Sequence, residues 1–103
     1  MKEIRQNIRY LGFENTEDGS RRFDFSITGT GLGSTPVSLF IPATMFTGIK
    51  RISFQESAKI CYEKLRVIVE EKAIQEPLRL WLTGDDIARF RHVPRGQSRI
   101  QQA

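Results

Sequence analysis

Cys61 and His92 are the only cysteine and the only histidine of this 103-residue chain, and together they could supply a nucleophile and its base. A thiol and an imidazole perform nucleophilic catalysis when both face one cleft. Cys61, however, shares an apolar helical stripe with Phe54 and Leu65, which predicts a buried and inert thiol. His92 falls at the end of a short expected helix. We find no nucleophile, base and orienting group that belong together, and we predict that the chain is not an enzyme.

Two short patterns match ligand-binding motifs only in part. Gly84-Asp85-Asp86 matches the aspartate pair with which polymerases hold two magnesium ions, but the chain is too short for such an enzyme. Aspartates in the first turn of a helix are stabilised by its free amides, so we interpret this pair as a helix cap. The glycine-rich segment 28–35 lacks the lysine of a phosphate-binding loop and precedes an expected strand, which favours a hairpin loop. The sequence predicts no metal and no cofactor.

The excess positive charge of the chain lies in its last fifteen residues. Residues 1–88 contain twelve basic and twelve acidic side chains, so the net charge of +4 belongs to the segment that follows. Four residues there are the candidate contacts with an anion or a nucleic acid: Arg89, Arg91, Arg95 and Arg99. Lys50 and Arg51 could assist them. Arginine favours forked contacts to phosphate or carboxylate, but a solvated terminus is the alternative interpretation of the same residues.

The N-terminal segment 2–13 fits two secondary structures. Ile4, Ile8 and Leu11 have helical spacing, but a turn-rich stretch at 15–20 follows and favours a strand over Ile8–Glu14. A helix here would give the order α-β-β-β-α, which resembles that of double-stranded-RNA-binding domains. The start of the second expected helix, Ser53-Phe54-Gln55-Glu56, lacks the basic cluster of that family, so we assign the chain to no family.

Three further segments alternate between apolar and polar residues, as strands with one solvent-exposed face do. They are Arg22–Thr28, Val37–Ile41 and a strand containing Leu78, Leu80 and Leu82. Pro36 and Pro42 bracket the second of these segments. Since proline cannot donate to a β-ladder, we expect that strand to be short and to lie at an edge of the sheet, at least at its ends.

Helical signals follow the second proline. A helical turn is expected near Ala43–Phe46, and a long helix over Ser53–Gln75 that begins with a capping box formed by Ser53 and Glu56. Its apolar stripe should pack on the sheet and consists of Phe54, Ala58, Cys61, Leu65 and Ile68. Thr83 and Asp86 predict the start of a short C-terminal helix that buries Ile87 and Phe90.

We therefore predict an α+β fold: an antiparallel sheet of three to four strands, with one long helix (about 53–75) on one face and a short C-terminal helix. Residues 1–95 should form one domain, and 96–103 a mobile basic tail. The expected core is Phe23, Phe25, Ile27, Val37, Leu39, Ile41, Phe54, Ala58, Cys61, Leu65, Ile68, Leu78, Leu80 and Leu82. A single cysteine favours a reducing, cytoplasmic setting, and no apolar run is long enough to predict a membrane partner.

A second apolar stripe on the long helix is the candidate protein interface. Ile60, Val67 and Ile74 recur every seven residues on the side away from Cys61 and Leu65. Either another part of the same chain or a second copy of the protein should cover them. Our leading hypothesis is a small non-enzymatic interaction module that self-associates through this stripe. The alternative is weak, sequence-independent nucleic-acid binding through the C-terminal arginines.

Overall fold

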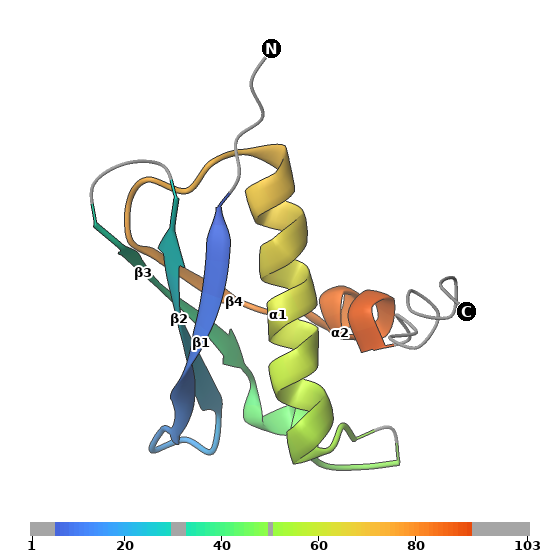
Figure 1. Cartoon of the computed structure of the whole chain (residues 1–103). Helices are drawn as coiled ribbons and strands as arrows, with labels where there is room; N and C mark the ends of the chain where they lie inside the picture. Colours follow the sequence, from blue (N-terminus) through green and yellow to red (C-terminus); the bar gives the residue numbers. More distant parts are fainter. Residues whose placement is uncertain (1–5, 30–32, 50, 92–103) are drawn as a thin grey trace.

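The computed structural model describes residues 6–29, 33–49 and 51–91. Its elements are β1 (Asn7–Asn15), β2 (Arg21–Thr28), β3 (Thr35–Ile41), the 3-10 turn η1 (Ala43–Phe46), α1 (Phe54–Glu71), β4 (Leu78–Trp81) and α2 (Gly84–Arg91). The four strands form one sheet in the order β1-β2-β3-β4. Figure 1 shows α1 beside the sheet, with β1 on one side of the helix and α2 on the other. The predicted α+β class, with one long and one short helix, is confirmed.

The sheet is mixed, so the prediction of a purely antiparallel sheet is wrong. β2 is antiparallel to both β1 and β3, whereas β4 runs parallel to β3. The strand 37–41 is not an edge strand along its whole length, because β3 lies between β2 and β4, but the ends of β3 have no partner on β4, as expected. β4 pairs only with Val37–Phe40, four of the five residues between Pro36 and Pro42. Neither proline therefore has to donate to that ladder.

β1 settles the ambiguity at the N-terminal end in favour of a strand. Residues 7–15 pair with β2 at every position except Leu11, so the helical alternative is wrong for the described part of segment 2–13. Within the described residues β1 has one neighbouring strand and forms an edge of the sheet. Most of its side chains are exposed.

α1 begins where the sequence predicts and ends earlier. Ser53 Oγ accepts a hydrogen bond from the Glu56 N–H at 3.0 Å, and Glu56 Oε1 accepts one from the Ser53 N–H at 2.9 Å. The last helical residue is Glu71, not Gln75. The Ile74 N–H donates instead to Gln6 Oε1 at 2.9 Å, and Gln6 Nε2 donates to the Ile74 carbonyl at 3.1 Å. These two bonds satisfy backbone groups that a longer helix would have used.

The core contains most of the expected residues, with changes on α1 and in other elements. Nine predicted residues are buried: Phe23, Phe25, Ile27, Val37, Leu39, Ile41, Cys61, Leu65 and Leu82. Four are half-buried against them: Ala58, Ile68, Leu78 and Leu80. The core also takes in Phe40, Ile52, Ile60, Ile74, Ile87 and Phe90. The prediction that Phe54 is buried is wrong. The buried side of α1 is centred on Ser57, Cys61 and Leu65, and Phe54 lies outside it.

α2 packs on α1 and is capped as predicted. The Asp86 N–H donates to Thr83 Oγ1 at 3.1 Å, and the Thr83 N–H donates to Asp86 Oδ2 at 2.9 Å. Ile87 and Phe90 are buried, as expected. In the described part of the chain, neither helix is long and apolar enough to cross a membrane. The domain boundary predicted after residue 95 and the tail 96–103 lie outside the described residues.

Candidate interaction surfaces

The C-terminal arginines do not form a cluster in the described part of the chain. Arg91 Nε lies 3.1 Å from Glu56 Oε2, and its Nη2 donates to the Arg51 carbonyl at 3.1 Å. Arg91 thereby fastens the end of α2 to the beginning of α1. The Arg89 guanidinium lies over the ring of Phe90, 4.8 Å from its centroid. Arg95, Arg99 and Lys50 lie outside the described residues.

The three residues of the predicted helix stripe do not form an exposed surface. Ile60 is 1 % exposed and belongs to the same core cluster as Ile87 and Phe90 of α2. Ile74 is 8 % exposed and lies beyond the end of α1. Val67 is half-buried and packs against the core. Cover from the same chain, one of the two expected alternatives, accounts for the burial of Ile60.

Two titratable side chains that the sequence offers for chemistry, Cys61 and Asp86, have structural roles: one lies in the core and the other caps a helix. Cys61 is fully buried, and this burial raises the pKa of its thiol far above the ordinary value. Asp86 caps α2 and accepts a hydrogen bond from Lys64 Nζ at 2.8 Å. Partial burial opposes its ionisation, but the bonds from Lys64 and Thr83 outweigh that effect and lower the pKa of Asp86. Among the described residues, no group of three or more His, Cys, Asp or Glu side chains could hold a metal ion.

Aromatic side chains gather instead where β1 and α1 meet. We call this surface the edge patch, and it consists of Tyr10, Phe13, Phe54 and Tyr62, which are 45 %, 38 %, 48 % and 38 % exposed. The ring of Tyr10 lies 5.3 Å from that of Phe25, and Phe13 meets Phe54 edge to face at 4.7 Å. The patch is thus continuous with the core but open to solvent.

A β-bulge in β1 puts the two strand residues of the edge patch on one face. Tyr10 is opposite Phe25 and Phe13 is opposite Phe23, so the four residues 10–13 of β1 match the three residues 23–25 of β2. Leu11 is the extra residue, and Gly12 has a φ of 136°, which favours glycine. Without the extra residue, Tyr10 and Phe13 would point to opposite faces.

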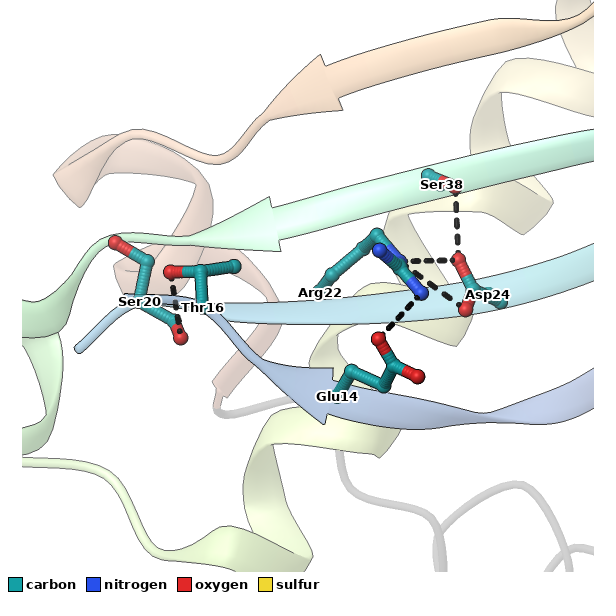
Figure 2. A network of polar contacts seen from close by, with 6 residues as sticks. All are labelled: Glu14, Thr16, Ser20, Arg22, Asp24 and Ser38. Atoms are coloured by element: carbon teal, nitrogen blue, oxygen red, sulfur yellow. Dashed lines mark hydrogen bonds and ion pairs between the residues drawn. The ribbon is translucent and has the colours of Figure 1, made fainter. Parts of the chain in front are cut away.

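The sheet face away from α1 is different in character, because its charged groups bind one another. Arg22 Nη2 lies 3.0 Å from Glu14 Oε1, and its Nε lies 3.0 Å from Asp24 Oδ1. Ser38 Oγ donates to the same Asp24 oxygen at 2.8 Å. Figure 2 shows this network running across β1, β2 and β3. We call this side the outer face, and it carries one strongly exposed aromatic side chain in its described part, Trp81.

Comparisons of the chain with protein-family models, with curated proteins and with solved structures returned no match. The surfaces described above are therefore the basis for any functional inference. The class they define is a two-layer α+β domain with an exposed aromatic edge.

Sequence reasoning missed the edge patch. Phe54 was assigned to the core, and Tyr10, Phe13 and Tyr62 were not selected as site residues. One signal was present in the sequence: Tyr10 and Phe13 flank a glycine in an expected strand. Glycine within a strand often marks a bulge, and a bulge would have placed both rings on the same face.

Proposed function

We propose that the chain is a small protein-interaction module, not an enzyme, and that it self-associates through the edge patch. The surface expected on the long helix is replaced in this proposal, because Ile60 and Ile74 are buried within one chain. We include a cytoplasmic setting in the proposal, since the single thiol of Cys61 is buried and has no cysteine partner in the sequence.

The observation that carries the proposal is the exposure of four aromatic rings on β1 and α1, two of which, Phe13 and Phe54, are in contact. Large apolar side chains that lie together on a surface mark interaction sites, and tyrosine and phenylalanine are enriched in protein interfaces. Tyr62 extends the patch along α1, where it lines a shallow hollow together with Ile8 and Val69. A second copy could bury these rings without any change in the core.

Support for nucleic-acid binding is weaker. Of the four C-terminal arginines, two are described, and one of these, Arg91, is already bound to Glu56 and to a backbone carbonyl. On the outer face, Arg22 is held between two carboxylates. The alternative stays a prediction, which binding measurements at low salt would test.

Sedimentation equilibrium tests the proposal with a matched pair of variants. Tyr10 and Trp81 are each about half exposed, and each contacts a buried phenylalanine from an edge strand. Tyr10→Glu places a charge in the edge patch and should weaken self-association about tenfold or more, because a buried charge without a partner is costly. Trp81→Glu places the same charge on the outer face and should leave self-association unchanged.

Far-UV circular dichroism confirms that both variants are folded. A wild-type chain that stays monomeric at high micromolar concentration contradicts the proposal. Equal weakening by Tyr10→Glu and Trp81→Glu also contradicts it, since the edge patch would then have no special role.

A further inference from the structure

We propose that β1 of one copy pairs antiparallel with β1 of a second copy, so that the two four-stranded sheets form one continuous sheet of eight strands. This inference rests on the proposed self-association and names its geometry. Among the described residues, no strand pairs with the edge of β1 that faces away from β2, although β1 is nine residues long. An open edge of this kind presents unpaired N–H and C=O groups to another strand. β1 contains neither proline nor lysine, which commonly block such pairing.

The bulge decides which side chains could face each other across this interface. Arg9 is opposite Ser26 and Glu14 is opposite Arg22, so both charged residues lie on the outer face. Tyr10 and Phe13 lie on the face of α1, as shown above. The β1 side chains therefore divide into a charged pair on one face and an aromatic pair on the other.

If the twofold axis that relates the two copies passes between Leu11 and Gly12, each charged residue faces the opposite charge and each aromatic residue faces an aromatic residue. In that register Arg9 of one copy lies opposite Glu14 of the second copy, and Tyr10 lies opposite Phe13 of the second copy. The interface then contains two ion pairs on the outer face and two aromatic pairs on the α1 face. Opposite charges and aromatic rings at directly opposed positions both stabilise antiparallel strands.

Neighbouring registers lose this complementarity. If the two strands shift by one residue relative to each other, Arg9 lies opposite Phe13 or Asn15 of the second copy. Both ion pairs are then lost, and residues from opposite faces are brought together. The side chains needed for the proposed register are accessible: Arg9 is exposed, and the Glu14 side chain is 67 % exposed. Glu14 binds Arg22 through Oε1, which leaves Oε2 for Arg9 of the second copy.

Charge reversal tests the pairing by mixing two variants. Arg9→Glu alone places Glu opposite Glu at both positions, and Glu14→Arg alone places Arg opposite Arg. Each should weaken self-association about tenfold. A mixture of the two variants restores both ion pairs in a heterodimer, so it should associate at least as tightly as the wild type. This recovery also shows that both variants are folded.

Cysteine cross-linking tests the register. Directly opposed residues in antiparallel strands have Cα atoms about 4.5–5.5 Å apart, which permits a disulfide. Arg9→Cys mixed with Glu14→Cys should form a disulfide-linked heterodimer under mild oxidation, whereas either variant alone should remain largely unlinked. Cys61 is buried and should not interfere.

The outcomes separate this inference from the proposed function. If the wild type does not self-associate, the proposed function and this inference both fail. If it does, but the mixed charge variants do not recover and the mixed cysteine variants do not cross-link, strand pairing in this register is wrong while self-association stands. Recovery together with cross-linking in the mixture alone is the result that we expect.

Discussion

Arg21 shows how a single residue organises the exposed rings. Its guanidinium carbon lies 4.5 Å, 4.8 Å and 5.3 Å from the ring centroids of Phe54, Phe46 and Phe13. Its Nε donates to Asn15 Oδ1 at 2.8 Å, which fixes the side chain in this position. Cation–π contacts of this kind hold Phe13 and Phe54 in place although both are exposed. Rings that are already fixed lose less entropy when they bind.

Gly12→Ala tests the bulge at the residue scale. No atom lies within 4 Å of a Cβ added at Gly12, so the cost comes from its φ of 136° alone. We expect a loss of about 1–3 kcal/mol in the free energy of unfolding, measured by urea titration at low protein concentration. Gly84→Ala is the control, because a Cβ there meets nothing closer than Met45 Cε at 3.8 Å. Equal effects at both positions would show that the bulge does not require glycine.

At the scale of elements, α2 is attached to α1 by contacts at both of its ends. Asp86 in its first turn lies 2.8 Å from Lys64 Nζ, and Arg91 in its last turn lies 3.1 Å from Glu56. A hydrogen bond from the Ser53 N–H, with help from Arg91, lowers the pKa of Glu56. Ile60, Ile87 and Phe90 belong to one buried cluster. This attachment buries Ile60, one of the three residues of the interface predicted from the sequence.

The acid sensitivity of this attachment is predictable in sign. Because the folded-state pKa of Asp86 is lowered, its contribution is present above the unfolded value of about 3.9 and is lost as pH falls through the folded value. Asp86→Asn should therefore cost about 1–2 kcal/mol in urea unfolding near pH 7, and less near pH 2. The exposed neighbour Asp85 supplies the control, Asp85→Asn, which should lose less than half as much. A difference between wild type and Asp86→Asn that grows in acid would contradict the assignment.

Sequence patterns predicted the structure correctly where the residues of an element alone determine its buried face or its ends. The alternation in β2 predicts its buried face, and the Ser53 and Thr83 caps predict both helix starts. Patterns were insufficient where a distant segment decides. The direction of β4 depends on where α1 returns the chain, and the end of α1 depends on Gln6, sixty-eight residues before Ile74. Exposure of the edge patch depends on β1 having no further neighbour among the described strands.

At the scale of the whole molecule, the two surfaces of the sheet have different roles. On the outer face, Arg22 and Ser38 both bind Asp24 within one chain (Figure 2). On the other face, α1 and the core cover β2 and β3, while the rings beside β1 stay exposed. Among the described residues, β1 therefore has no neighbour at one edge of the sheet, and the proposed self-association through β1 and α1 would supply one.

Backbone hydrogen exchange at low and high protein concentration tests this account most directly. Exchange reports the opening of individual amides, so it locates the surface that becomes protected. We predict that amides of β1 exchange more slowly at high concentration, while those of β4, at the opposite edge of the sheet, keep the same rate. Rates in β1 that do not change with concentration, or slowing that appears at β4 instead, would contradict the proposed interface.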